Sequence, residues 1–324
     1  MRRSQRVWNI EGDARSNEKI FEMLRPGAAP LPQPAQDPLT LLFRRSMLWK
    51  PERYARSAWI EHVPFAFWLV DVLRPRVIVE LGAYSGVSYS AMCQAVKSLG
   101  LATACFAVDT WRGDEHAGFY AEDVYCEFAA FHDRHFSAHS RLVRSTFDDA
   151  LSHFDDSTID LLHIDGLHSY DAVNHDYQTW LPKLSRNAII LLHDTNVRER
   201  DFGVHRLWAE ISADRLHFEF LHGYGLGVLA TGADYADPLN VLLEAEGNES
   251  LTADIRTMFS ALGRFTQDAM ELSLMREALA RNAEAHASAM NLAMRIVCGP
   301  PSRLLAGLRA AMDYMLKGDP AAGL

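Results

Sequence analysis

Two aspartates follow apolar segments that are typical of strands, and together they could bind a metal ion. Asp165 ends the predicted strand 158–165, and Asp194 follows the predicted strand 187–193. Because ligands of a parallel α/β sheet bind at the carboxyl ends of its strands, we expect both carboxylates at one rim. Two carboxylates without nearby cations repel each other and invite a hard divalent cation such as Mg²⁺. The sequence therefore predicts a metal site at Asp165 and Asp194.

A histidine lies three residues beyond the first of these aspartates. His168, with an ordinary pKa of about 6.5, is the predicted general base for a hydroxyl whose proton the metal would loosen. An alternative is that Asp165 and Ser169 cap the next helix and that His168 is a turn residue. His163 and His193 lie within the ends of the same two strands and are predicted to be buried and hydrogen-bonded rather than ligands.

The turn after the first predicted strand has the composition of a ligand-binding turn. Residues 77–88 read VIVELGAYSGVS, an apolar run followed by Glu80 and by a G-x-x-x-G pattern at Gly82 and Gly86. A strand that turns into a helix presents backbone N–H groups and a positive dipole end to a ligand. Glu80 would repel a pyrophosphate and attract an ammonium or sulfonium group, and the third glycine of dinucleotide enzymes is missing. The pattern argues against NAD, with an ordinary strand–helix turn as the alternative.

A further acid ends the second predicted strand. Asp109 is placed to accept hydrogen bonds from the hydroxyls of a ribose, with a helix cap or a turn carboxylate as the alternative. The loop beyond it, 110–120, begins with Thr110 and Trp111 and is long and rich in aromatic residues. Loops of this kind often cover a ligand, and simple packing is the alternative.

A doubly wound α/β fold would bring these residues together. Apolar strands alternate with helices along the chain, which favours a parallel sheet. The predicted strands are 76–81, 103–109, 140–145, 158–165, 187–193, 217–222 and 225–230, and the predicted helices are 57–73, 86–99, 121–136, 147–153, 169–183 and 203–212. We therefore expect an α/β fold with a seven-stranded, mainly parallel sheet, a terminal antiparallel hairpin and a long C-terminal helical extension.

The pattern divides the chain into three parts. Residues 1–56 are predicted to be an arm with a proline-rich linker, 57–238 the α/β domain, and 239–324 a helical, coiled-coil-like extension. Apolar residues of the extension repeat at alternating spacings of four and three, over roughly six heptads from Leu251 to Val297. This repeat predicts a homo-oligomer that forms through the C-terminal helices, and the alternative is one long helix folded back on the domain.

Composition argues against several classes of protein. The 324 residues carry a net charge of −10 and no basic run, which argues against nucleic-acid binding. The four cysteines show no C-x-x-C spacing and are expected to be reduced and mostly buried. No apolar run is long enough to span a bilayer, and the first residues lack a signal-peptide pattern, so the predicted location is the cytoplasm. The predicted last helix, 302–317, could contact a membrane surface, but packing in a dimer is favoured.

Four segments, taken in order, resemble a known family. They read VIVELGAYSGVSYS, AVDTWRGDEHAGFY, LLHIDGLHSYDAVNHDYQTWLPKL and HDTNVRERDFGVHRLW. They resemble the class I S-adenosylmethionine-dependent methyltransferases of the methyltransferase-24 family and are similar to metal-dependent sugar O-methyltransferases. The resemblance and the motifs give as candidate cofactor-binding residues Glu80, Gly82, Ala83, Tyr84, Ser85, Gly86, Asp109, Thr110, Trp111 and Asp165. The resemblance also implies a metal at Asp165 and Asp194 and a base at His168.

The resemblance implies an O-methyltransferase that uses S-adenosylmethionine and, with it, Mg²⁺. The expected acceptor is a hydroxyl of a sugar in a glycan or glycolipid precursor, methylated by in-line displacement with His168 and Asp165 as catalytic residues. The main alternative is a non-catalytic, methyltransferase-like module that scaffolds glycan-synthesis enzymes through the heptad region. An oxidoreductase is disfavoured, since the histidines lack a two-histidine, one-carboxylate iron arrangement.

Overall fold

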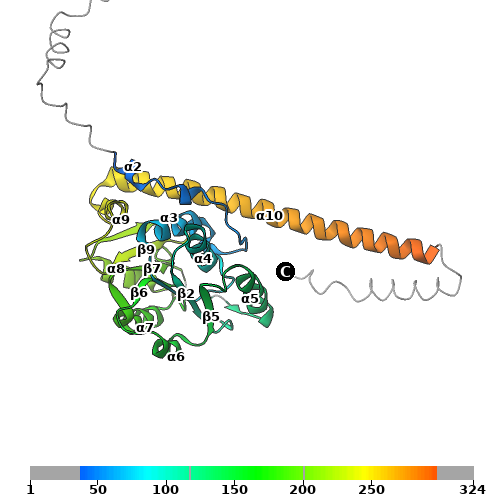
Figure 1. Cartoon of the computed structure of the whole chain (residues 1–324), viewed down its shortest axis with the longest axis horizontal. Coiled ribbons are helices and arrows are strands. Elements are labelled where there is room, and N and C mark those ends of the chain that lie inside the picture. The colour runs from blue at the N-terminus through cyan, green and yellow to red at the C-terminus, as the bar shows by residue number, and fades with distance from the viewer. Residues whose placement is uncertain (1–36, 117, 200, 298–324) are drawn as a thin grey trace, which may run out of the picture.

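A seven-stranded sheet lies at the centre of the computed structural model, which describes residues 37–116, 118–199 and 201–297 (Figure 1). The strand order is β5-β2-β1-β6-β7-β9-β8. The strands are β1 (Val77–Leu81), β2 (Ala104–Asp109), β5 (Ser140–Arg144), β6 (Ile159–Ile164), β7 (Leu184–His193), β8 (His217–Phe220) and β9 (Leu226–Ala230). The first five of these pair in parallel, and β9 runs antiparallel to both of its neighbours. The predicted fold class is confirmed.

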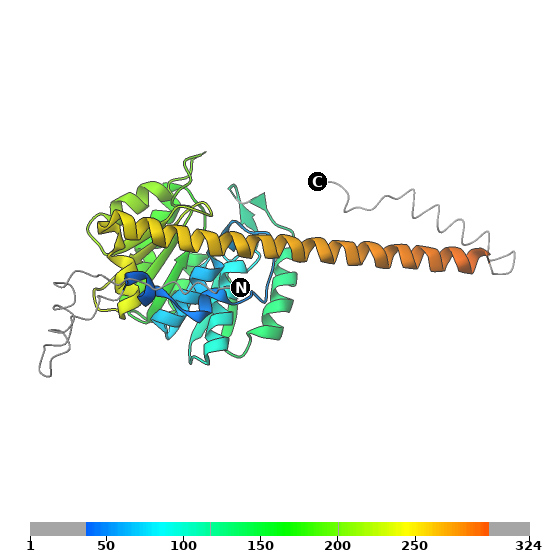
Figure 2. The same ribbon diagram turned by 90° about the horizontal axis from the view of Figure 1, so that it is seen from above.

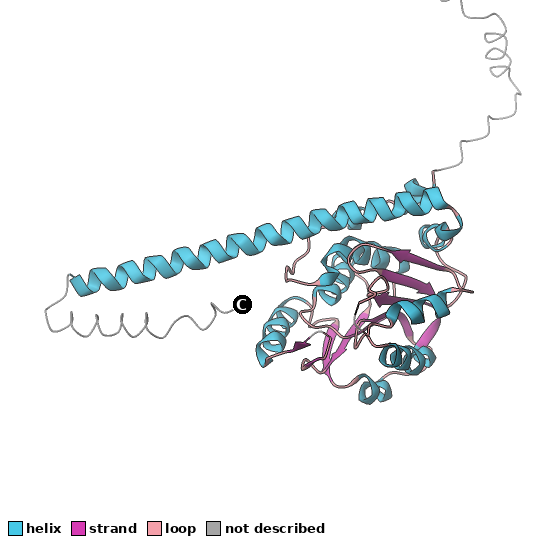
Figure 3. Ribbon diagram, turned by 180° about the vertical axis from the view of Figure 1, so that it is seen from behind, coloured by secondary structure: helices cyan, strands magenta, loops and turns pink. Residues whose placement is uncertain are grey.

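Helices pack on both faces of this sheet (Figure 3). The helices between the strands are α3 (Val63–Leu73), α4 (Val87–Leu99), α5 (Glu122–His135), α6 (Phe147–Ala150), α7 (Tyr170–Trp180) and α8 (Val204–Ser212), with 3-10 turns at Ala58–His62, Leu151–His153 and Leu181–Lys183. Pro64 lies in the first turn of α3, where its missing N–H has no helical partner to lose. The predicted segment 57–73 therefore divides into a 3-10 turn and a helix. Two hydrophobic cores result, one under α3 and α4 and one under α7 and α8.

The loop after β2 contains a small hairpin that the sequence did not predict. Strands β3 (Gly113–Asp114) and β4 (Gly118–Phe119) pair antiparallel as a separate two-stranded sheet. Gly113 has a φ of +74°, and a Cβ there would collide with the carbonyl of Gly118. Only glycine therefore fits the start of this hairpin.

Residues 37–56 pack against the domain, although they belong to the segment predicted as an arm and linker. They form α2 (Pro38–Leu42) and a 3-10 turn at Arg45–Leu48. Leu42 is buried, and its carbonyl accepts a hydrogen bond of 2.6 Å from Trp68 Nε1 on α3. This part of the predicted arm thus contributes to the core.

The C-terminal region consists of α9 (Asp237–Leu243), a 3-10 turn at Ala245–Gly247 and the 49-residue helix α10 (Glu249–Val297). The first half of α10 lies along the domain, and the second half projects past it (Figures 1 and 2). Ile255, Phe259 and Met270 are buried in the docked half, whereas Phe265 of the predicted heptad seam is 74 % exposed. The docked face follows the 3.6-residue helical turn and not a strict seven-residue repeat.

The projecting half of α10 carries exposed apolar side chains. These are Leu272, Met275, Leu279, Met290, Leu292 and Met294. All of these except Leu292 lie along one side of the helix. This row, unpartnered within the described chain, keeps self-association as the prediction.

Leu279→Glu is expected to weaken that self-association at least about tenfold, because a carboxylate buried in a helix seam without a partner costs at least about 1.4 kcal/mol. Sedimentation over a concentration series measures the dissociation constant. Ser288→Glu is the matched control, since nine residues place it on the opposite side of the helix. A wild-type chain that sediments as a monomer at all concentrations contradicts the prediction.

Within the described ranges, no helix is both long enough and apolar enough to cross a bilayer. The predicted helix 302–317 lies outside these ranges.

Candidate active site

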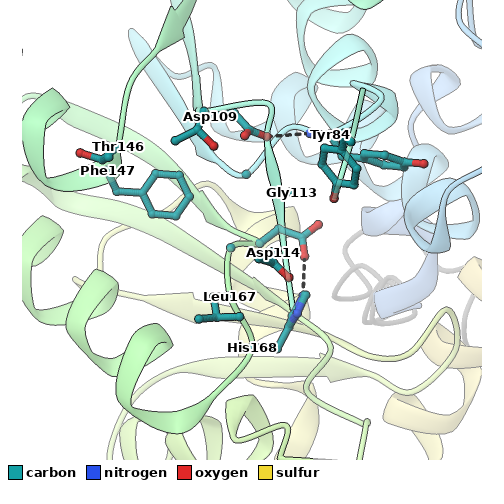
Figure 4. Close-up of a pocket in the computed structure, with 13 residues that line it drawn as sticks. Tyr84, Asp109, Gly113, Asp114, Thr146, Phe147, Leu167 and His168 are labelled. Carbon is teal, nitrogen blue, oxygen red and sulfur yellow. Dashed lines mark hydrogen bonds and ion pairs between the residues drawn. The ribbon is translucent and has the colours of Figure 1, made fainter. Parts of the chain in front are cut away.

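A cavity of about 460 Å³ lies at the carboxyl ends of β1, β2, β5 and β6, which is a common size for a small-molecule site (Figure 4). Asp109, Phe147 and His168 border it on different sides. The residues that line it are Gly82, Tyr84, Asp109, Thr110, Gly113, Asp114, Tyr120, Thr146, Phe147, Asp165, Gly166, Leu167 and His168. Three of them are aspartates, so the cavity favours a cationic ligand.

Half of the candidate cofactor residues line this cavity. They are Gly82, Tyr84, Asp109, Thr110 and Asp165. The others lie behind the wall and are Glu80, Ala83, Ser85, Gly86 and Trp111. Their roles as direct ligands stay predictions. The carbonyl of Ser85 accepts a hydrogen bond of 2.7 Å from Arg53 Nε, and the contacts of the other four follow.

Gly82 allows the end of β1 to approach the end of β6 closely. Its N–H donates to Val108 O at 3.0 Å, and its φ is +86°. A Cβ would collide with the carbonyl oxygen of Asp165. Gly86, with a φ of +75°, caps α4, and Phe128 occupies the space that its side chain would need. Both glycines of the motif are therefore required by backbone geometry.

The carboxylate of Asp109 organises the turn behind the cavity. Its Oδ2 accepts the N–H groups of Ala83 and Tyr84 at 2.9 and 3.0 Å, and its Oδ1 accepts that of Trp111 at 2.7 Å. The buried Trp111 ring donates in turn to Tyr84 O at 3.0 Å. Asp109 is thus both a turn carboxylate, the alternative interpretation of the sequence, and a residue of the cavity wall.

Asp109→Asn is expected to lower the free energy of unfolding by about 2 kcal/mol, because an amide NH₂ cannot accept the N–H groups that the lost oxygen accepted. Urea denaturation followed by circular dichroism measures the change. Asp155→Asn, an exposed aspartate elsewhere, removes the same charge and serves as the control. Equal stability of the two variants would contradict this account of the turn.

Glu80 lies behind the cavity wall and not on its surface. Its side chain is fully buried on the face of β1 that α4 covers, where Oε1 accepts the hydroxyl of Ser88 at 2.7 Å. Oε2 lies 3.2 Å from Nδ1 of His163, whose Nε2 accepts the indole N–H of Trp59 at 3.0 Å. Burial raises the pKa of Glu80, and His163 partly opposes that shift. Glu80 therefore braces β1 against its neighbours and does not face the cavity, and His163 is buried and hydrogen-bonded as predicted.

Two aspartates and two histidines meet at the rim beside the cavity. His168 Nε2 lies 2.9 Å from Asp194 Oδ2 and 3.6 Å from Asp165 Oδ1. His193 Nδ1 lies 3.3 Å from Asp165 Oδ1 and 3.5 Å from Asp194 Oδ2. The predicted meeting of Asp165, Asp194 and His168 is confirmed, and His193 joins them. We call these four residues the ion cluster.

The four groups hold one another in their charged forms. Burial disfavours the charged form of His168, but hydrogen bonds with Asp165 and Asp194 and their charges outweigh it and raise its pKa to about 9. The same balance raises the pKa of His193. Burial would raise the pKa of Asp165, but the charge of His193 and the hydrogen bonds of both histidines lower it. The cluster is thus electrically balanced at neutral pH, and the ordinary pKa expected for His168 is corrected upward.

His193 was missed as a site residue because its place within a strand indicated a buried core histidine. It is buried, and its Nε2–H donates to Gly223 O at 3.0 Å, which leaves Nδ1 facing the aspartates. His62 Nε2 reaches the same carbonyl at 3.2 Å. One carbonyl of the turn between β8 and β9 therefore orients a ring of the ion cluster.

The donor atoms of the ion cluster do not fit the predicted Mg²⁺. One atom each of Asp165, His168 and Asp194 lies within 4.8 Å of the other two, so the spacing alone suits a cation. Mg²⁺, however, takes oxygen ligands and keeps several waters, and here imidazole nitrogens lie against the carboxylate oxygens. The histidines also supply the positive charge that two bare carboxylates would seek. No catalytic step is therefore assigned to Mg²⁺.

The structure also shows features of the site that were not predicted from the sequence. Thr146 and Phe147 line the cavity and follow β5, so the rule that ligands bind at strand ends could have found them. Asp194 has a φ of +61°, a left-handed backbone conformation that Asp adopts more readily than most residues. The ring of Phe202 stacks on His168 with centroids 4.6 Å apart and planes 7° apart.

Parts of the chain are similar to known proteins. Residues 79–195 match the Methyltransf_24 family model, described as "Methyltransferase domain". A protein of Sinorhizobium fredii (strain NBRC 101917 / NGR234), described as "Uncharacterized protein y4gI", is 52 % identical over 183 residues, which cover 56 % of this chain and 20 % of that protein. The chain therefore spans about one fifth of the length of this relative.

Solved structures with a similar course of the chain include two complexes with a cofactor. Cofactor-bound Rv0187 from MTB has a TM-score of 0.42 at 15 % identity, covering 67 % of this chain and 97 % of that chain. The O-methyltransferase TomG from Streptomyces achromogenes, in complex with SAM, has a TM-score of 0.41 at 13 % identity, covering 67 % of this chain and 96 % of that chain. The family model thus relates residues 79–195, which run from β1 to the end of β7, to methyltransferase domains.

Proposed function

We propose that the protein is an S-adenosylmethionine-dependent O-methyltransferase. The observation that carries the proposal is the 460 Å³ cavity with three aspartates, which opens at the strand ends next to the ion cluster. S-adenosylmethionine carries an ammonium and a sulfonium, so carboxylates favour it over an anionic dinucleotide. The methyltransferase domain match over residues 79–195 supports the same interpretation.

His168 is the proposed base. Its Nε2 faces Asp194, and its Nδ1 is a buried nitrogen without a hydrogen-bond partner among the described residues. In the neutral ring Nδ1 can take the proton of an acceptor hydroxyl while the oxygen attacks the methyl carbon. Bound S-adenosylmethionine would supply the methyl group, and its carbon–sulfur bond would break as the carbon–oxygen bond forms, which would leave a neutral thioether. Asp194 and Asp165 stabilise the imidazolium that forms.

The acceptor class we propose is a sugar hydroxyl in a glycan or glycolipid precursor. The family resemblance of the segments around Asp165 and Asp194 supports it, and so does the polar rim. His116 Nε2, for example, lies 2.6 Å from Asp201 Oδ1 beside the ion cluster. Transfer of a radiolabelled methyl group to a panel of nucleotide sugars, glycolipids and catechols tests the class. Labelling of catechols alone would contradict it.

Titration calorimetry separates this function from its alternatives. One S-adenosylmethionine per chain should bind, and NAD should give no heat because the aspartates repel its pyrophosphate. The projecting half of α10 favours a second candidate, the scaffolding module. Absence of heat with S-adenosylmethionine, together with no rise in melting temperature, would favour that module and reject the enzyme.

The pH dependence of the rate follows from the raised pKa of His168. Only the neutral ring accepts a proton, and its fraction grows as pH rises toward about 9. We expect kcat/KM to rise about tenfold per pH unit below that value and then to level off. The groups that face the ring are Asp165, Asp194 and the stacked His116 and Phe202. Rates measured between about pH 6 and pH 10 test this, and a plateau reached by about pH 7 would contradict it.

A further inference from the structure

Two thiols and an imidazole converge outside the candidate active site. Cys93 comes from the middle of α4, Cys105 from β2, and His139 from the residue before β5. One ligand atom of each lies within 4.8 Å of those of the other two. None of the three lines the methyltransferase cavity, and the proposed reaction does not use them.

Separate elements hold this group in place. The backbone N–H of Cys105 donates to His139 O at 2.9 Å, so the pairing of β2 and β5 places these two residues side by side. His139 Nε2 lies 3.2 Å from the carbonyl of Cys93, which ties the ring to α4. Both thiols are buried, and His139 is half-buried. The arrangement is therefore part of the core and not a chance contact of surface side chains.

The donor set selects a class of ligand. Thiolate sulfur and imidazole nitrogen are the ligands of Zn²⁺, whereas Mg²⁺ and Ca²⁺ require oxygen. Tetrahedral Zn²⁺ with bonds of about 2.0–2.3 Å separates its donors by about 3.5–3.8 Å, which lies within the observed spacing. A disulfide between the two cysteines would not involve the imidazole, so it would not explain why His139 converges on them.

A cavity borders two of the three residues. A second cavity, of about 510 Å³, is lined by Cys105 and His139 together with residues 101–104 at the start of β2. An ion could enter from this cavity, and a water molecule there could complete a four-coordinate site.

We propose that Cys93, Cys105 and His139 bind Zn²⁺ with the fourth position facing this second cavity. The ion joins α4 to β2 and β5, and α4 begins directly after its cap Gly86, behind the turn of the methyltransferase cavity. The site stands independently of the proposed methyl transfer.

Metal analysis of the purified full-length chain tests the proposal. After loading with Zn²⁺ and dialysis, mass spectrometry of the metal is expected to find one ion per chain, and the melting temperature is expected to rise by about 5 °C. Substitution with Co²⁺ should give a thiolate-to-cobalt charge-transfer band in the near ultraviolet. This spectrum is recorded on the wild-type chain, so it does not depend on a variant that folds.

Variants locate the ion. Cys105→Ser and His139→Gln are expected to lose most of the bound metal. Cys126→Ser, which alters an exposed thiol, and Asp194→Asn, which alters the ion cluster, should keep it. Three results would overturn the proposal: a wild-type chain with neither zinc nor the cobalt band, zinc that is lost in Asp194→Asn and kept in Cys105→Ser, or a native mass lower by two hydrogens that shows a Cys93–Cys105 disulfide.

Discussion

Replacing Gly82 with alanine is expected to abolish S-adenosylmethionine binding and to lower the free energy of unfolding by about 3 kcal/mol or more. The residue has a φ of +86°, and a Cβ would collide with the carbonyl oxygen of Asp165. Relief of that collision separates the ends of β1 and β6, which together form one wall of the cavity. Urea denaturation and titration calorimetry measure the two effects.

Gly100→Ala is the matched control for this variant. Gly100 has a φ of +62° as the cap of α4, but no atom lies within 4 Å of the position that a Cβ would take there. Alanine should therefore cost only the left-handed backbone strain of about 1 kcal/mol, with cofactor affinity unchanged. If Gly82→Ala behaves like Gly100→Ala in both measurements, the close approach of β1 and β6 does not shape the cofactor site.

Replacing His168 with glutamine is expected to lower kcat/KM about 10³-fold while the dissociation constant of S-adenosylmethionine changes less than about twofold. Glutamine keeps a hydrogen-bonding side chain toward Asp194 but has no group that titrates near pH 9. Steady-state kinetics with the identified acceptor and calorimetry with the cofactor separate these effects. The rise of the rate with pH should also disappear, which a merely structural role of His168 would not explain.

His175→Gln provides the comparison for this variant. His175 lies on α7 and pairs with Asp148 at 2.8 Å on the surface. Its loss should leave both the rate and the pH profile unchanged. A His168→Gln enzyme that keeps most of its activity would assign the proton to another group, and the ion cluster would then be structural.

The sheet could be predicted from the sequence because its signal is local. The apolar runs that form β1, β2, β6 and β7 are short and bounded by turn residues, and helical segments separate them. The predicted meeting of Asp165 and Asp194 needed only the rule that parallel strands end at one rim. The β3–β4 hairpin escaped prediction because two-residue strands have no periodicity to detect.

The sequence was least informative where a role depends on the side of a strand that a residue faces. Glu80 was expected at the cofactor because it precedes a glycine turn, yet strand alternation directs it under α4 toward Ser88. His193 was expected to be a core residue, and it is buried, but one of its ring nitrogens reaches the ion cluster. A sequence gives residue types and their order. The roles of Glu80 and His193, however, depend on which groups of other elements their side chains contact.

The long C-terminal repeat shows a different limit. Its four–three spacing describes a seam, but the domain uses part of that surface: Ile255 is buried, and Met258 and Leu262 are partly buried against the core. A heptad pattern does not show how many helical turns pack against the chain's own domain and how many remain for another helix. Of the described part of the repeat, the projecting half of α10 is what remains for the predicted oligomer.

The carbonyl of Gly223 has a consequence that reaches beyond the turn in which it lies. It accepts from both His62 and His193, so it joins the edge hairpin of the sheet to the chain that precedes α3 and to the ion cluster. A ligand that displaced this hairpin would therefore alter the hydrogen bond that orients His193, although no side chain of β8 or β9 lines the cavity.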